Sequence, residues 1–192
     1  MKDKITKDIQ ESIDVKAGLL KTHVPLIERA ARLVFECLKR GNKVIFFGNG
    51  GSASDSQHLA AELVGRYEKE RRGFPAIALT TDTSIITAVG NDYSFERIFE
   101  RQIEALGAKG DVAFGISTSG NSKNVLLGIQ KAKSLGLTTI GFSGRAGGAL
   151  HSLVDLSIVV PSNKTSRIQE SHIMIGHIIC ERLDELFSPN GG

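Results

Sequence analysis

Apolar residues recur at helical spacing through the first 40 residues of the chain, and the pattern then changes to short aliphatic runs. Ile5, Ile9 and Ile13 stand four residues apart, which predicts the apolar face of a helix. A second apolar series follows Pro25, a residue suited to the first turn of a helix. This series is expected to stop at Gly41-Asn42. The pattern therefore predicts two consecutive helices before the rest of the fold begins.

Five short aliphatic runs follow, each about the length of a buried strand, and helical patterns separate them. Near-continuous apolar strands that alternate with helices are typical of a parallel sheet covered on both faces. We therefore expect an α/β fold that is three-layered and doubly wound. The expected strands are Val44–Phe47, Ala76–Leu79, Val112–Ile116, Thr138–Phe142 and Leu156–Val160, and the expected helices lie at 53–66, 84–89, 95–106, 124–135 and 165–186.

The chain shows no linker and no long low-complexity segment, so we expect a single domain over residues 1–192. Its α/β core should span residues 43–187, after the helical pair at 1–41. The last five residues, SPNGG (188–192), have the composition of a disordered tail.

Composition excludes several classes of protein. Hydrophobic residues make up 41% of the chain and charged residues 23%, as in ordinary globular proteins. The net charge of +3 gives no electrostatic case for nucleic-acid binding. The polar N-terminus lacks the apolar core of a signal peptide, and no run approaches the length of a membrane span. With Cys37 and Cys180 interpreted as reduced thiols, the expected location is the cytoplasm.

Two loops rich in glycine and hydroxyl groups follow expected strands: GNGGSASD at 48–55 and STSGNS at 117–122. In doubly wound sheets, ligands bind at the carboxyl ends of the strands. Glycines allow backbone N–H groups to approach a ligand, and a helix N-terminus favours an anion. Ordinary turns with helix-capping residues are the alternative. Two such loops on one sheet edge favour a phosphate or sugar site, and neither carries a nucleotide-binding signature.

Two pairs of polar residues on expected helices are candidates for chemistry. His58 and Glu62 are four residues apart and therefore share a helix face. Gln169 and His177 are two turns apart on the last helix and can line one stripe. Two imidazoles and a carboxylate suit zinc or a similar divalent ion, and the same groups suit acid/base catalysis. A surface ion pair with core or interface histidines is the alternative, and His172 is taken as structural.

Five segments of the chain are similar to the phosphoheptose isomerases, a branch of the sugar-isomerase (SIS) domain proteins. The similarity covers nearly the whole chain, including the two leading helices. The matching segments are GNGGSASDSQHLAAELVGR (48–66), AVGNDYSFERIFERQ (88–102), GISTSGNSKNV (115–125), GFSGRAGG (141–148) and RIQESHIMIGHIIC (167–180).

The resemblance implies a five-stranded parallel sheet in a homotetramer, with the helical pair at 1–41 taking part in oligomerisation. It implies active sites between subunits, which would bring the helices of the two polar pairs together. One zinc ion per subunit would be held by His58, Glu62, Gln169 and His177. The substrate would contact Asn49, Gly50, Gly51, Glu62, Asn91, Asp92 and Gln169, with its phosphate end held by Ser117, Thr118, Ser119 and Ser122.

The implied reaction is an aldose–ketose isomerisation. It converts sedoheptulose 7-phosphate to D-glycero-D-manno-heptose 7-phosphate, the first step toward heptose for lipopolysaccharide or surface polysaccharide. We assign Glu62 as the base at carbon and His177 as its acid/base partner, although the two roles could be reversed. Some family members have Asp where this chain has Ser166, and we expect that difference to affect the rate and not the reaction.

Three alternatives use the same fold. Relatives that assist the bacterial replication initiator bind without catalysis; they lack a glutamate at the position of Glu62 and break the glycine-rich loop, whereas this chain keeps both. A regulatory SIS domain that senses sugar phosphates would sit beside a DNA-binding module, for which this chain has no room. An arabinose 5-phosphate isomerase would carry a different set of motifs.

Overall fold

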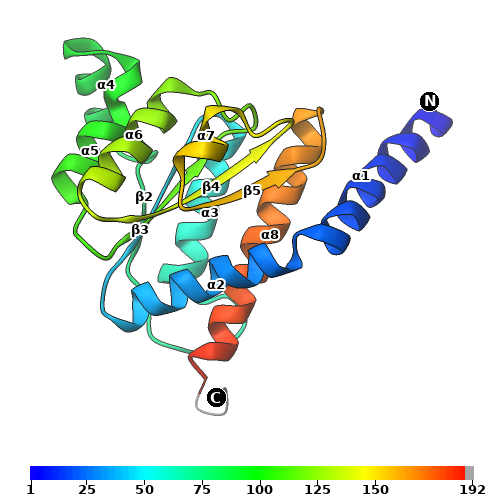
Figure 1. Ribbon diagram of the computed structural model, residues 1–192, viewed down its shortest axis with the longest axis horizontal. Coiled ribbons are helices and arrows are strands. Elements are labelled where there is room, and N and C mark those ends of the chain that lie inside the picture. The colour runs from blue at the N-terminus through cyan, green and yellow to red at the C-terminus, as the bar shows by residue number, and fades with distance from the viewer. Residues whose placement is uncertain (189–192) are drawn as a thin grey trace.

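Five parallel strands form one sheet in the order β2-β1-β3-β4-β5, with helices on both faces (Figure 1). The computed structural model describes residues 1–188. The elements are α1 (Lys2–Thr22), α2 (Val24–Lys39), β1 (Val44–Gly48), α3 (Gly51–Val64), β2 (Ala76–Ala78), α4 (Thr83–Asp92), the 3-10 helix η1 (Phe95–Arg97), α5 (Ile98–Leu106), β3 (Val112–Ile116), α6 (Lys123–Ser134), β4 (Thr138–Gly144), α7 (Gly148–Leu153), β5 (Leu156–Val160) and α8 (Thr165–Leu186).

Neighbouring residues of a strand enter different cores, because successive side chains of a strand point to opposite faces. In β1, Phe46 joins the core formed with α1, α2, α3 and α8. Phe47 joins the second core, formed with α5, α6 and α7. Both side chains are buried. The continuous apolar runs in the sequence are therefore strands covered on both sides, and the predicted three-layer α/β fold is confirmed.

The strand order places the two glycine- and hydroxyl-rich loops next to each other. β1 and β3 are hydrogen-bonded neighbours, with Gly48 opposite Ile116 at their carboxyl ends. The chain leaves β1 for α3 on one face of the sheet and leaves β3 for α6 on the other face. Such a reversal of winding opens a crevice at the sheet edge, where ligands bind in doubly wound folds.

The helices differ from the prediction in four main places. α4 spans Thr83–Asp92 and so ends three residues later than the expected helix at 84–89. α7 was not predicted, because six residues after a glycine-rich turn are too short to show a period. α3 begins at Gly51 and ends at Val64, two residues earlier at each end than expected. The expected helix at 95–106 is divided into η1 and α5. Of the predicted tail, Ser188 donates a hydrogen bond to the carbonyl of Asp184, 2.7 Å away, and residues 189–192 lie outside the described part.

The N-terminal half of α1 extends away from the sheet, whereas its C-terminal half meets α2 and α8 (Figure 1). Ile5, Ile9 and Ile13, the stripe seen in the sequence, are each more than half exposed. Leu19 is the one fully buried residue of α1 within the described chain. Across residues 1–188, no helix combines the length and the apolar character needed to cross a bilayer.

Candidate metal and substrate site

The two loops at the sheet edge are joined by a reciprocal pair of amide hydrogen bonds. Asn49, just after β1, donates to the Oδ1 atom of Asn124 over 2.8 Å, and Asn124 donates back to Asn49 over 2.9 Å. Asn124 is buried at the start of α6. Because each side-chain amide both donates to the other and accepts from it, this pair fixes the spacing between the glycine-rich loop and the serine-rich loop.

The serine-rich loop gathers three hydroxyl groups at one point. The Oγ atom of Ser117 lies 2.9 Å from that of Ser122 and 3.4 Å from that of Ser119. The loop is held from behind by the turn that precedes α7. A Cβ atom on Gly120 would lie 1.8 Å from the carbonyl oxygen of Gly147, so only glycine fits there. This geometry suits a tetrahedral anion, which hydroxyl and backbone N–H groups can surround.

Three side chains from α3 and α8, the helix after the glycine-rich loop and the last helix, converge at one point. The Nε2 atom of His58 lies 3.0 Å from the Oε1 atom of Glu62 and 3.0 Å from the Nε2 atom of His177. Their potential ligand atoms all lie within 4.8 Å of one another. His58 is 48% exposed and Glu62 is 25% exposed, so the group is open to solvent from one side. We call His58, Glu62 and His177 the triad.

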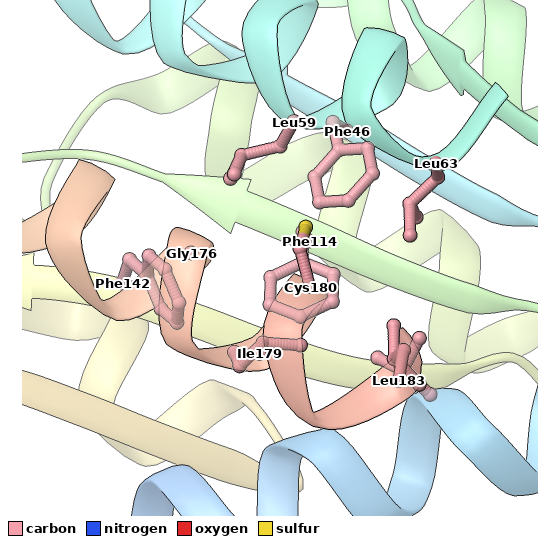
Figure 2. A pocket seen from close by; sticks show the side chains of 10 residues that line it. Phe46, Leu59, Leu63, Phe114, Phe142, Gly176, Ile179, Cys180 and Leu183 are labelled. Carbon is pink, nitrogen blue, oxygen red and sulfur yellow. The ribbon is translucent and has the colours of Figure 1, made fainter. Parts of the chain in front are cut away.

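The absence of a side chain at Gly176 allows the triad to form. A Cβ atom on Gly176 would lie 2.4 Å from the Cδ2 atom of Leu59, so α3 and α8 approach more closely here than two larger residues would permit. Gly176 directly precedes His177, and Leu59 directly follows His58. Figure 2 shows Leu59, Gly176 and Cys180 around a small apolar cavity between these helices and the sheet.

The triad fits a divalent cation better than it fits protons alone. A histidine Nε2 atom has one hydrogen-bonding direction in the plane of its ring, either a proton or a lone pair. His58 nevertheless presents this atom at 3.0 Å to both Glu62 and His177. A proton on this atom can serve one of these contacts, whereas a cation can be bound by both imidazole nitrogens and the carboxylate oxygen at once. Two imidazoles and one carboxylate form a donor set typical of zinc and related ions.

The comparisons with known proteins agree with this geometry. The sequence profile described as SIS domain matches residues 9–144. A phosphoheptose isomerase of Aquifex aeolicus is 56% identical over 186 residues, which cover 97% of each chain. Solved phosphoheptose isomerases of Neisseria gonorrhoeae and Francisella tularensis superpose with TM-scores of 0.91 and 0.92 at 41% and 40% identity, covering 95% of this chain and 98% and 97% of theirs.

The chain belongs to the phosphoheptose isomerase family. The family relationship predicted from the five sequence segments is thus confirmed, and so is the class of enzyme, an isomerase. The match to the Aquifex aeolicus relative extends over almost its full length, so the triad and both loops lie inside the matched region.

One inference from the family resemblance needs correction. Assembly of subunits was expected to bring the two polar pairs together, but α3 and α8 pack side by side within a single chain and run in the same direction (Figure 1). Leu59 meets Gly176 near their middle, and Gly51 meets Gln169 near their beginning. The sequence could not show this, because 119 residues separate His58 from His177.

Gln169 lies at the beginning of α8, against the first turn of α3. A Cβ atom on Gly51 would lie 2.2 Å from the Nε2 atom of Gln169, so the amide rests on the first turn of α3. Eight residues separate Gln169 from His177, which is about 12 Å along a helix axis. His58, Glu62 and His177 are three of the four expected ligands, and the amide of Gln169, the fourth, lies against the glycine-rich loop, so its part in metal binding stays a prediction.

Asn91 and Asp92 lie at the end of α4, in the part of the chain that carries η1 and α5. Both are exposed, and the amide of Asn91 donates to the Oδ1 atom of Asp92 over 2.8 Å. No residue of α4 is fully buried within the described chain. Their expected contact with a substrate stays a prediction.

Two residues of the site were not singled out from the sequence. Tyr67, just beyond α3, places its ring 5.6 Å from that of His177. Asp55 lies one turn before His58, and burial raises its pKa to about 6. Its Oδ2 atom is buried and finds no hydrogen-bond partner among residues 1–188. The spacing of Asp55 and His58 on one helix was a readable signal, whereas the position of Tyr67 depends on how the loop after α3 folds.

Proposed function

We propose that this protein interconverts sedoheptulose 7-phosphate and D-glycero-D-manno-heptose 7-phosphate, with one divalent ion, zinc, at the triad of each subunit. The observation that carries the proposal is the convergence of Glu62 and His177, through His58, at the helix that follows an intact glycine-rich loop. The names of the curated relatives support the same reaction. The non-catalytic alternative finds no support among these relatives.

The proposed chemistry has two net proton transfers, one from C1 to C2 and one from O1 to O2. Glu62 removes the proton from C1 of the ketose while the C2 oxygen gains a proton, which gives an enediol. A proton then returns at C2 and the O1 proton leaves, which gives the aldose. His177 moves the proton between the two oxygens, and the reverse assignment of Glu62 and His177 is compatible with the same arrangement. Each residue moves a proton in a ligation state in which that side chain is not bound to the ion. A divalent ion held by the triad would supply Lewis-acid charge that polarises the carbonyl group.

We propose that the remaining residues hold the substrate at its two ends. Ser117, Thr118, Ser119 and Ser122 surround the phosphate, because they place hydroxyl and backbone N–H donors at the start of α6. Asn49, Gly50, Gly51 and Gln169 face the sugar, and Asn91 and Asp92 add contacts from α4. Gln169, whose amide lies against Gly51, serves as the fourth metal ligand.

A homotetramer is part of the proposal, and the exposed apolar stripe of α1 supports it. Ile5, Ile9 and Ile13 are 54%, 57% and 52% exposed on one helix face, and Leu20 is 73% exposed. Each Å² of apolar surface buried by association through this face would contribute about 25 cal/mol. We further propose a cytoplasmic location and a product that feeds heptose synthesis for lipopolysaccharide or surface polysaccharide. Two free, buried cysteines are consistent with a reducing compartment.

The test is a turnover assay with sedoheptulose 7-phosphate, with and without a chelator, that follows formation of the aldose. We expect turnover that the chelator abolishes and added zinc restores. Glu62→Gln should lose at least 1,000-fold in kcat and keep the assembly seen by size-exclusion chromatography. Glu70→Gln, at a 90% exposed carboxylate, is the control and should behave as the parent. No turnover at any metal loading would favour the replication-associated binding protein instead.

A further inference from the structure

A buried ion pair ties the loop after α3 to the end of α8. The Nε atom of Arg71 donates to the Oδ1 atom of Asp184 over 2.6 Å, and the two side chains are 9% and 2% exposed. Asp184 also accepts from the backbone N–H groups of Glu68 and Lys69, at 2.8 and 2.9 Å. Burial alone would raise the pKa of Asp184, but these N–H groups and Arg71 outweigh it and hold the pKa below its ordinary range.

The other end of Arg71 reaches the last turn of α3. Its Nη2 atom donates to the carbonyl of Glu62 over 2.9 Å, and its Nη1 atom donates to the carbonyl of Leu63 over 3.0 Å. The last carbonyls of a helix lack partners within the helix. A cation at this end is also favoured by the helix dipole. Arg71 therefore caps α3 directly behind the backbone of Glu62.

The same loop carries Tyr67 to the triad. Tyr67 lies next to Glu68, whose N–H group is bound to Asp184, and its ring rests 5.6 Å from the ring of His177. Arg71 itself packs over Phe74, with its Cζ atom 4.1 Å from the ring centroid. The ion pair thus links the base on α3, the aromatic ring over His177 and the end of α8.

We propose that Arg71 and Asp184 are positioning residues for the isomerisation: they fix the backbone of Glu62 and hold Tyr67 against His177. This inference rests on the proposed function. Stability alone is a weak reason for such a pair, because the desolvation of two buried charges offsets much of their attraction. The pair is placed where a small displacement of Glu62 would misalign the transfer of the carbon-bound proton.

The experiment compares Asp184→Asn and Arg71→Lys with Asp111→Asn. Asp111 is a matched control, because it is 1% exposed, as buried as Asp184, binds Lys43 at 2.6 Å and accepts two backbone N–H groups. It lies before β3, at the sheet edge opposite to the two loops. We expect about a ten-fold lower kcat, at zinc saturation and with KM within two-fold, in the Asp184 and Arg71 variants only. Asp184→Glu should restore most of the loss.

A second readout needs neither metal nor substrate. The chain has no tryptophan and two tyrosines, so in a Tyr93→Phe background the tyrosine emission reports Tyr67 alone. We expect acrylamide to quench this emission more strongly in Asp184→Asn and Arg71→Lys than in Asp111→Asn. Should Asp184→Asn fail to fold, Arg71→Lys decides, because lysine keeps the charge and loses the planar set of donors.

The proposal is overturned if folded Asp184 or Arg71 variants turn over like Asp111→Asn, or if their Tyr67 quenching equals that of the control. A parent protein without turnover would instead refute the proposed function, and the quenching comparison would still decide whether the pair holds Tyr67 in place.

Discussion

Gly176→Ala should separate α3 from α8 and thereby weaken the triad. The new Cβ atom would lie 2.4, 2.8 and 3.1 Å from the Cδ2, Cδ1 and Cγ atoms of Leu59. Comfortable carbon contacts lie near 3.5–4.0 Å, so the helices or Leu59 must give by about 1 Å. The neighbouring cavity of about 10 Å³ has room for no more than about one water molecule, so it can take only a small part of the displaced side chain (Figure 2).

Overpacking of this kind costs about 1–3 kcal/mol of unfolding free energy. The distance between the Nε2 atoms of His58 and His177, which is 3.0 Å, should therefore increase by up to about 1 Å. We therefore expect Gly176→Ala to weaken zinc binding and to lower kcat, both measured against the parent. Urea unfolding gives the stability, and competition with a chromophoric chelator gives the metal affinity.

Leu59→Ala supplies the decisive comparison. Alone it should cost about 2–5 kcal/mol, because it leaves a cavity. Combined with Gly176→Ala it should cost less than the sum, by a coupling of about 1–3 kcal/mol, since the clash is gone. Gly128→Ala is the control: its Cβ would lie 2.8 Å from Phe47 on the other face of the sheet, so it should lose stability and keep metal affinity. Additive free energies, or a Gly176→Ala protein with unchanged zinc affinity, would refute the reasoning.

Three further predictions concern other parts of the chain. Gly120→Ala should raise KM about ten-fold with a smaller change in kcat, because its Cβ would collide with Gly147 and shift the serine-rich loop; an unchanged KM in steady-state assays would contradict this. In metal-free protein, Asp55 binds a proton more tightly folded (pKa about 6) than unfolded, so its contribution to stability is lost as pH rises from 3.8 through about 6. Burial lowers the pKa of His172 to about 4, so the unfolding free energy falls as pH falls from 6.5 toward 4. Urea unfolding measured from pH 4 to 7.5 should show that Asp55→Asn and His172→Gln each remove their own part of this pH dependence. A pH dependence equal to that of the parent in both variants would disprove the assignment. Cys180, with its pKa raised to about 12 by burial, should resist alkylation in the folded protein, and Cys180→Ser should keep its kcat; rapid alkylation or lost turnover in folded protein would count against this.

Much of the fold was readable from the sequence because its signals are local. The runs Val112–Ile116 and Leu156–Val160 are strands with the predicted bounds, and the last helix spans Thr165–Leu186 as expected. A strand covered on both faces must be apolar at nearly every position, so its length is visible directly. α7 carries no such signal, because its six residues complete fewer than two helical turns.

The candidate site was readable in parts. Spacing along one helix pairs His58 with Glu62, since residues four apart are neighbours on a helix surface. The serine-rich loop was visible from its composition, and family resemblance added the roles of the other residues. Tyr67 and Arg71 gave no signal, because their partners His177 and Asp184 lie more than 100 residues away along the chain.

The sequence by itself determined the strands, every helix but α7, the family and which side chains can bind a metal or move a proton. Tertiary structure alone decided that α3 and α8 run side by side in one chain, that His177 meets His58, and that Gln169 rests on Gly51 instead. The physical reason is that periodicity reports which face of an element is buried, not which element covers it. The partner is chosen by close packing, and here a missing side chain at Gly176 leaves the space that Leu59 fills.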